Sequence, residues 1–161
     1  MSHQSHLSAG VAQAAALVER VSHLSDDWRL ARAMHQQLRE MGMPRVNFFL
    51  VGPDTVTHHL LELLLPDLSD PITTWCPGQR LVLPPLADTG TMIFYDVGAL
   101  GRADQWRLLE HLGRANGELQ IVSTSPAPLM PRVHAGTFDD TLYYRLNHIY
   151  VESDGQNRRQ L

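Results

Sequence analysis

The sequence contains a single cysteine, Cys76, and no long run of apolar residues. One cysteine cannot form an internal disulfide, and such low cysteine usage is typical of proteins in a reducing compartment. No apolar run approaches the ~20 residues needed to span a bilayer. The N-terminus is polar and lacks the apolar core of a signal peptide. We therefore expect a cytoplasmic protein with no membrane partner.

Positive charge is also in short supply. The chain carries 13 lysine and arginine residues against 17 aspartate and glutamate residues, and its formal net charge is −4. A balance of this sign gives no indication of a surface for polyanions, so nucleic acid is not an expected partner. The 161 residues suffice to bury a core and fit one domain.

The expected domain spans residues 10–151, and its N-terminal helices lie within residues 10–43. Residues 1–9 are polar, and we expect them to be flexible. Residues 152–161 form a polar tail that we expect to be disordered.

Hydrophobic periodicity predicts that helices and strands alternate along the chain. Helices are expected over residues 11–23, from Ser25 or Asp26 to Gly42, from Thr55 or Thr57 to Leu65, from Arg102 or Ala103 to an end at Gly113 and Gly117, and from Asp139 or Asp140 to Leu146. Strands are expected over residues 46–51, 72–76, 80–83, 92–95, 119–123 and 148–151. A proline-rich loop is expected over residues 125–131. The alternation predicts an α/β fold, a parallel sheet with helices on both faces, and we expect residues 46–51 at its centre.

The apolar run 92–95 is the central feature of the sequence. It shows no alternation, which is typical of a strand covered on both faces. Asp96 follows at the carboxyl end of this strand, where open α/β sheets bind ligands. The residue pattern alone leaves open whether Asp96 serves a site or only caps the following turn.

Several side chains are assigned to the core by their position or type. The expected core includes Cys76 and all three tryptophans, the inner stripe of the second helix, and the inner face of the helix that follows Asp96. These residues are Trp28, Ala31, Met34, His35, Leu38, Trp75, Cys76, Trp106, Leu108, Leu109 and Leu112. Of the adjacent Tyr143 and Tyr144, one is expected to pack inward and one outward.

Three separated segments resemble one protein family, the AAA+ activators of sigma-54 RNA polymerase, also called bacterial enhancer-binding proteins. Residues 86–100 resemble its Walker B block without a gap. Residues 105–112 continue its Q-x-x-L-L-x-x-L helix. Residues 136–147, which end in Leu-Tyr-Tyr-Arg-Leu-Asn, are similar to its G-x-F-R-x-D-L-Y-Y-R-L-N block, the most specific match. The resemblance covers residues 46–151 and implies a three-layer, P-loop NTPase-like fold, the AAA+ core.

The sequence departs from this family at the phosphate loop. The family reads G-E-x-G-T-G-K-E after its first strand, whereas residues 52–59 read Gly-Pro-Asp-Thr-Val-Thr-His-His. Gly52 is retained, but Thr57 replaces a glycine and His58, mostly neutral at pH 7, replaces the lysine. A phosphate cradle needs small residues and that cation. The resemblance therefore implies a degenerate site, and we expect neither ATP nor magnesium as a cofactor.

The acids and arginines that serve catalysis in this family also differ. Tyr95 stands where the family's first acid holds Mg²⁺, and it is a poor ligand for that ion. Asp96 keeps the second acid, and Ser125 replaces a polar sensor residue that is usually Asn. Asp139 replaces the first arginine of the last block. Little catalysis is therefore expected.

Arg145 matches the second arginine of that block. The resemblance implies that it contacts a neighbouring subunit, and the alternative is an ion pair within its own chain. The vestigial nucleotide site comprises Gly52, Thr57, His58, His59, Asp96 and Ser125. We assign no catalytic residue and no metal.

Two segments of the family are not expected in this chain. The family carries a long insertion before its Walker B block, with a G-A-F-T-G-A loop that touches sigma-54, and only residues 78–85 stand in its place. The family's helical lid is not expected after residue 151. The resemblance thus does not imply direct remodelling of the polymerase.

These observations predict a truncated, non-catalytic domain, a pseudo-ATPase that acts by protein–protein interaction in bacterial transcription regulation. Its expected partner is a full-length sigma-54 activator or a second copy of itself. One alternative is a nucleotide-binding regulator without hydrolysis. A second is an unrelated hydrolase or metal site at His58, His59 and Asp96, although adjacent histidines on a helix point about 100° apart.

Overall fold

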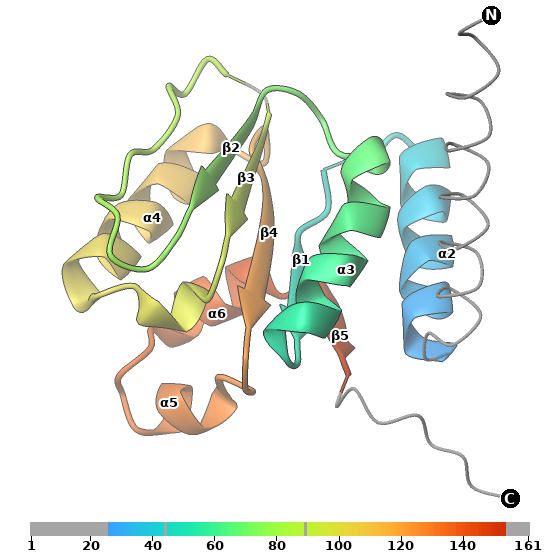
Figure 1. Ribbon diagram of the computed structural model, residues 1–161. Helices are drawn as coiled ribbons and strands as arrows, with labels where there is room; N and C mark the ends of the chain where they lie inside the picture. The colour runs from blue at the N-terminus through green and yellow to red at the C-terminus, as the bar shows by residue number, and fades with distance from the viewer. Residues whose placement is uncertain (1–25, 44, 89, 154–161) are drawn as a thin grey trace, which may run out of the picture.

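Five short parallel strands form one sheet, in the order β2-β3-β4-β1-β5 (Figure 1). The computed structural model describes residues 26–43, 45–88 and 90–153. The strands are β1 (Phe48–Val51), β2 (Ile72–Trp75), β3 (Thr91–Phe94), β4 (Gln120–Ser125) and β5 (Ile149–Glu152). The predicted parallel sheet is confirmed, but β4 lies at its centre, and residues 46–51 do not.

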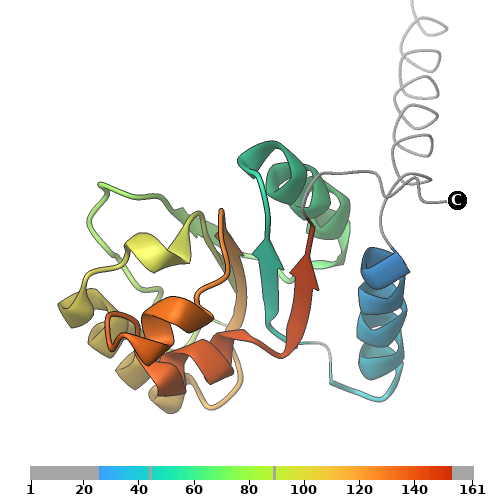
Figure 2. The same cartoon turned by 90° about the horizontal axis from the view of Figure 1, so that it is seen from below.

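Helices cover both faces of the sheet, which confirms the predicted three layers. On one face lie α2 (Asp26–Glu40) and α3 (Asp54–Leu64), and on the other lie α4 (Arg102–Ala115) and α6 (Asp140–Leu146) (Figures 1 and 2). The short α5 (Met130–His134) follows the end of β4. Two 3-10 turns, η1 (Leu65–Asp67) and η2 (Val97–Ala99), follow α3 and β3.

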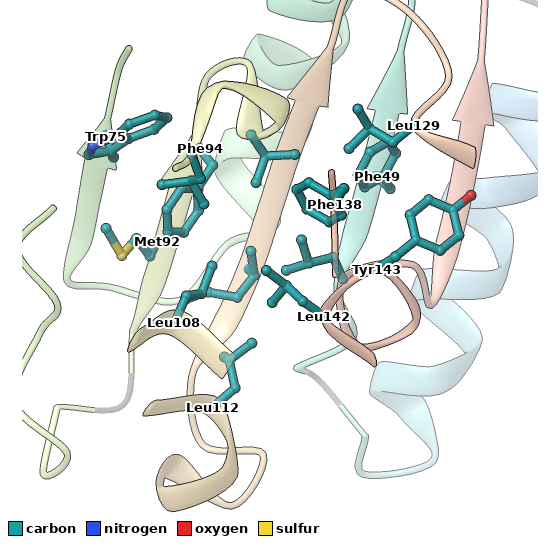
Figure 3. Close-up of a cluster of buried hydrophobic side chains, with 14 of the residues drawn as sticks. Phe49, Trp75, Met92, Phe94, Leu108, Leu112, Leu129, Phe138, Leu142 and Tyr143 are labelled. Carbon is teal, nitrogen blue, oxygen red and sulfur yellow. The ribbon is translucent and has the colours of Figure 1, made fainter. Parts of the chain in front are cut away.

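Alternation along the strands divides the interior into two cores. In β1, Phe48 and Leu50 pack toward α2 and α3, whereas Phe49 and Val51 pack toward α4 and α6. Figure 3 shows the second of these cores, where Leu108, Leu142 and other side chains from the helices meet the strands. All four residues of β3 are buried, as predicted for a strand covered on both faces.

Helix ends follow local signals that the sequence displays. The N-cap of α6 is Asp139, whose carboxylate accepts a hydrogen bond of 2.8 Å from the N–H of Leu142. Helix α4 runs past Gly113 and ends at Asn116 and Gly117, which both have positive φ. Of the two glycines predicted to end this helix, Gly113 lies within it, whereas Gly117 follows its C-cap residue, Asn116.

Three predicted elements differ from the structure. No strand forms over residues 80–83, where Leu81 is buried within an irregular connection. The proline-rich segment 125–131 does not remain a loop throughout, because α5 begins at Met130 with Pro131 in its first turn. Strand β4 also extends to Ser125, two residues beyond its predicted end.

Some burial predictions are corrected by the way the helices lie on the sheet. Trp106 is 61% exposed, because α4 turns Gln105, Leu108 and Leu112 inward. Met34 on α2 is also exposed, and Cys76 is only half-buried. The predicted separation of the two tyrosines is confirmed: Tyr143 is 6% exposed and Tyr144 is 64% exposed.

The ends of the chain extend the fold only where the structure describes them. Strand β5 reaches Glu152, so the prediction that the disordered tail begins at this residue is wrong. The helix predicted over residues 11–23 and the rest of the tail beyond Ser153 lie outside the described residues. Within residues 26–43, 45–88 and 90–153, no helix has the length and apolar character to cross a membrane.

Candidate functional site

The residues that follow β1, β3 and β4 meet at the carboxyl edge of the sheet. The N–H of Gly52 donates to the carbonyl of Ser125 over 3.0 Å. The N–H of Asp96 donates to the Oγ1 of Thr124 over 3.1 Å. Because all strands are parallel, this edge is where the fold would place a ligand, and the structure brings the predicted Gly52, Asp96 and Ser125 together there.

Gly52 is fixed by the strand beside it. Its φ is +153°, and a Cβ at this position would lie 2.1 Å from the carbonyl oxygen of Ser153. Ser153 in turn donates its N–H to the carbonyl of Val51. The need for glycine at position 52 therefore arises from the close approach of the backbone that follows β5.

The connection between β1 and α3 consists of Gly52 and Pro53 alone. Pro53 is the N-cap residue, and its carbonyl accepts hydrogen bonds from the N–H groups of Val56 and Thr57, at 2.9 and 3.0 Å. Thr57 is buried, and its hydroxyl donates to the carbonyl of Asp54 over 3.3 Å. Positions 54–59, part of a loop in the family frame, are thus helical in this chain.

His58 and His59 point in different directions from α3. The exposed ring of His58 meets Tyr95 edge to face, with 5.2 Å between ring centroids. The Nδ1 of His59 lies 3.9 Å from a carboxylate oxygen of Glu62, and its Nε2 is buried without a hydrogen-bond partner among the residues described. The two histidine side chains are therefore not placed to bind the same metal ion or ligand.

Tyr95 faces α3 from the end of β3. Its pKa is raised, first by burial and then by the nearby Cys76 and Glu62. The phenol therefore remains neutral over the physiological range. His58 and Tyr95 stand at the positions that hold a lysine and a magnesium-binding acid in the family frame, and here their two rings are in contact.

Asp96 adopts an unusual backbone conformation at the start of η2. Its φ and ψ are 51° and 65°, in the left-handed region. Burial raises the pKa of its carboxyl, the charge of Asp54 raises it further, and Arg132 lowers it. Asp96 is the N-cap residue of η2, but its side chain makes no capping hydrogen bond there. It lies at the carboxyl edge of the sheet, and a role in a site stays a prediction.

Arg132 is a residue of this edge that sequence reasoning missed. It comes from α5, and its guanidinium donates to the carbonyl of Gly98 over 2.5 Å. It also influences the pKa of Asp96. The prolines of this segment predict a loop, and no local pattern indicates that its arginine turns back toward η2.

The remaining predicted residues divide between the two edges of the sheet. Ser125 is buried, and its hydroxyl donates to the carbonyl of Ala127 over 2.5 Å. Arg145 lies elsewhere, at the end of α6 that leads into β5, where its carbonyl accepts a hydrogen bond from Asn47. Its exposed side chain contributes to lowering the pKa of His148, after burial. Arg145 therefore lies apart from Gly52, Asp96 and Ser125, which we call the carboxyl-edge group.

Metal-ligating side chains do not gather within the described parts of the chain. Over residues 26–43, 45–88 and 90–153, no three His, Cys, Asp or Glu side chains are placed to share an ion. Three hollows identified among those residues lie beside α2 and η1, between α4, α5 and α6, and at the amino edge of the sheet, and their linings include none of Gly52, Asp96 and Ser125.

This chain matches a known sequence family. The model of a family described as the sigma-54 interaction domain matches residues 29–153. That range covers more than half of the chain and contains every residue of the carboxyl-edge group. No curated protein sequence matches this chain.

Solved structures share this fold at low sequence identity. NtrX from Brucella abortus has a TM-score of 0.58 at 17% identity, covering 91% of this chain and 42% of that one. NtrX in complex with ATP has a TM-score of 0.51 at 18% identity, over 76% and 36%. The Holliday junction branch migration motor RuvB from Thermotoga maritima has a TM-score of 0.54 at 14% identity, over 80% and 44%. This chain spans less than half the length of each.

Proposed function

The chain belongs to the sigma-54 interaction domain family, and we propose that it is a non-catalytic member that acts by binding other proteins. The observation that carries the proposal is the connection from β1 to α3. Only Gly52 and Pro53 separate the strand from the helix, so the loop that would wrap a phosphate group is replaced by the first turn of α3.

The backbone at this connection supports the proposal. A phosphate cradle depends on N–H groups that are free to reach the anion. Pro53 has no N–H, and those of Gly52, Val56 and Thr57 already donate to carbonyls of the chain. The carboxylate of Asp54 stands at the same helix start and would repel a triphosphate.

Side-chain chemistry points the same way. The sequence contains no lysine at any position, so no residue of this chain can supply the lysine of a P-loop. The ring of Tyr95 packs against His58. Of the two Walker B acids in the family, only the second has a counterpart here, Asp96. Because Mg²⁺ prefers carboxylate oxygens, we infer that these residues do not fit magnesium ATP.

The partner we propose is a protein of the cytoplasm, either a full-length sigma-54 activator or a second copy of this chain. The domain would act in bacterial transcription regulation by occupying a contact that a complete subunit would otherwise make. Arg145 supports this role because its side chain is exposed at the end of α6, away from the carboxyl edge.

Nucleotide binding is tested by thermal unfolding of the protein with and without ATP and magnesium, together with a phosphate-release assay. We expect no rise in melting temperature at about 1 mM ATP, because a ligand that binds the folded state must raise it. His58→Ala and Asp96→Asn serve as site variants, and Arg107→Gln, on α4, serves as the control.

The outcomes separate the alternatives. A rise in melting temperature that is lost in the site variants, without phosphate release, would establish the nucleotide-binding regulator instead. Phosphate release that requires Asp96 would overturn the proposal. Hydrolysis of other esters that depends on His58 and His59 would favour the unrelated hydrolase.

The proposed partner is tested with a purified sigma-54 activator from the same genome. We expect this chain to change the ATPase rate of the activator, and Arg145→Ala to reduce that effect. Light scattering of the chain alone measures self-association. A chain that stays monomeric and leaves the activator unaffected would contradict both proposed partners.

A further inference from the structure

A hollow of about 890 Å³ lies between α2 and η1, and its charged lining consists of three arginines and two acids, Glu40 and Asp67. Arg29, Arg32, Gln36 and Arg39 come from α2, and we call these four residues the arginine row. Glu40, also from α2, accepts a hydrogen bond from Gln36 over 3.3 Å, and Asp67 comes from η1. The hollow is remote from the carboxyl edge, and nothing in the proposed function has assigned it a role.

The spacing of the arginine row follows from helix geometry. Positions 29, 32, 36 and 39 are separated by three, four and three residues, so they share one side of α2. At 1.5 Å per residue the row extends for about 15 Å along the helix. The buried face of α2, formed by Trp28, Ala31 and His35, lies next to it and packs on the sheet. The row is therefore held on a rigid support.

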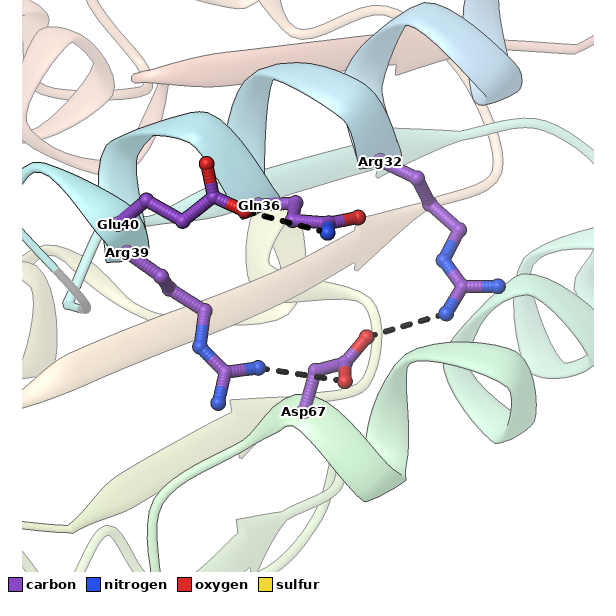
Figure 4. Close-up of polar contacts among 5 residues, drawn as sticks. All are labelled: Arg32, Gln36, Arg39, Glu40 and Asp67. Carbon is purple, nitrogen blue, oxygen red and sulfur yellow. Dashed lines mark hydrogen bonds and ion pairs between the residues drawn. The ribbon is translucent and has the colours of Figure 1, made fainter.

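A carboxylate is already seated on this row. One oxygen of Asp67 lies 3.2 Å from a guanidinium nitrogen of Arg32, and the other lies 3.3 Å from one of Arg39 (Figure 4). Both arginine side chains are 45% exposed, and Asp67 is 29% exposed. Two guanidinium groups thus share one carboxylate, and each has five N–H donors of which one is used here.

We propose that the arginine row binds an acidic peptide segment of a protein partner. An extended peptide with an acidic residue at every second position presents carboxylates about 7 Å apart on one side, so the row can meet two or three of them. Guanidinium groups pair with carboxylates through strong, charge-assisted hydrogen bonds. A single inorganic anion would engage only one end of the row.

Asp67 acts as an internal competitor in this arrangement. Its carboxylate occupies the donors of Arg32 and Arg39 that face η1, and an incoming acidic residue must share or displace it. The inference rests on the proposed function in one respect, since it names the chemistry of the protein partner. It does not depend on the loss of nucleotide binding.

The probe is a fluorescein-labelled decapeptide in which Glu alternates with Ser, titrated with the full chain at low salt and followed by fluorescence anisotropy. The double variant Arg32→Gln/Arg39→Gln is expected to weaken binding at least about tenfold, because two charge-assisted contacts are lost. Asp67→Asn is expected to tighten it about threefold. Arg107→Gln, an exposed arginine paired with Asp104 on the other face of the sheet, is the matched control and should leave binding unchanged.

Asp67→Asn separates a binding role from a merely structural one. A structural ion pair would show a lower melting temperature in that variant and no tighter peptide binding, which would overturn the inference. Equal losses in the double variant and in Arg107→Gln would also overturn it, because they would indicate unspecific charge attraction.

Two further probes identify competing ligands. A single-stranded oligonucleotide of matched charge that binds more tightly than the peptide would overturn the inference in favour of nucleic acid, and inorganic phosphate that displaces the peptide at equal concentration would do so in favour of a free anion. Melting temperatures with ATP, measured on the same samples, keep the result independent of the proposed function. If the peptide binds but the ATPase rate of the sigma-54 activator does not change, that activator is not the partner. Binding of acidic peptides by the arginine row would still be supported.

Discussion

Gly52 illustrates how a residue that matches a nucleotide-binding pattern can owe its place to packing. Its φ is positive, and a Cβ added there would lie only 2.1 Å from the carbonyl oxygen of Ser153, so there is no room for a side chain. The resemblance to a phosphate loop explains this glycine differently, by the need for small residues around a phosphate group. The backbone of Ser153 is sufficient to require it.

Gly52→Ala is therefore expected to lower the free energy of unfolding by about 3 kcal/mol, from overpacking and from a backbone conformation that alanine disfavours. Gly113→Ala is the matched control, because Gly113 lies within α4 and has open space around it. That variant should gain about 0.5–1 kcal/mol from helix propensity. Urea unfolding measures both, and equal effects of the two substitutions would contradict this account of Gly52.

Asp96 is expected to make stability depend on pH. Because its pKa is raised in the folded protein above the ordinary value of 3.8, the folded state binds the proton more tightly than the unfolded chain does. Stability contributed by the protonated carboxyl is fully present below pH 3.8 and is lost as pH rises through the raised pKa. Ionised Asp96 therefore destabilises the fold at neutral pH.

The variant Asp96→Asn removes this charge and suits the left-handed backbone. We expect it to melt at a higher temperature than the wild type at pH 7 and at the same temperature near pH 3. Thermal unfolding across this range measures the difference. A gap between the two proteins that does not vary with pH would show that the charge of Asp96 is not its cause.

At the scale of elements, Asn47 joins three of them. Its Oδ1 accepts a hydrogen bond from the N–H of Ile121 in β4, and its Nδ2 donates to the carbonyl of Arg145 at the end of α6, both over 2.8 Å. Its carbonyl accepts from the N–H of Ile149 in β5. One buried residue thus satisfies backbone groups that would otherwise be unpaired.

Asn47→Ala is expected to cost about 2–4 kcal/mol of stability, because the N–H of Ile121 and the carbonyl of Arg145 would lose their partner in a buried place. Gln37→Ala, on the exposed side of α2, should change stability by less than about 0.5 kcal/mol. Denaturant titration of both variants tests this. A loss below about 1 kcal/mol for Asn47→Ala would mean that water replaces the amide.

At the scale of the whole molecule, one sheet separates two cores. Ile121 of β4 belongs to the core under α4 and α6, and Ile149 of β5 belongs to the core under α2 and α3. Strand β1 lies between these two strands. Neither side chain therefore shares a core with the other, although both depend on the same sheet.

Ile121→Val and Ile149→Val are each expected to cost about 1 kcal/mol, and the double variant should show the sum within about 0.5 kcal/mol. Urea unfolding should remain a single transition in all three proteins, because both cores are built on the same five strands. Val82→Ala, at an exposed position, is the control. Separate transitions for the two cores would contradict this picture.

The sequence by itself determined the α/β class, the parallel sheet and the family. Continuous apolar runs specified strands buried on both faces, and the helix cap at Asp139 followed from local chemistry. The group formed by Gly52, Asp96 and Ser125 was also predictable, because parallel strands bring their carboxyl ends to one edge. These features depend on residue order and short-range physics.

The tertiary structure alone decided which side chains face inward and which distant groups meet. Trp106 is exposed because α4 is rotated on the sheet so that Gln105 and Leu108 face inward. Hydrophobicity alone does not predict this rotation. Arg132 reaches η2, and Arg32 and Arg39 reach Asp67, across connections that no local pattern encodes. Such contacts depend on how helices are placed on the sheet, which is a property of the packed chain as a whole.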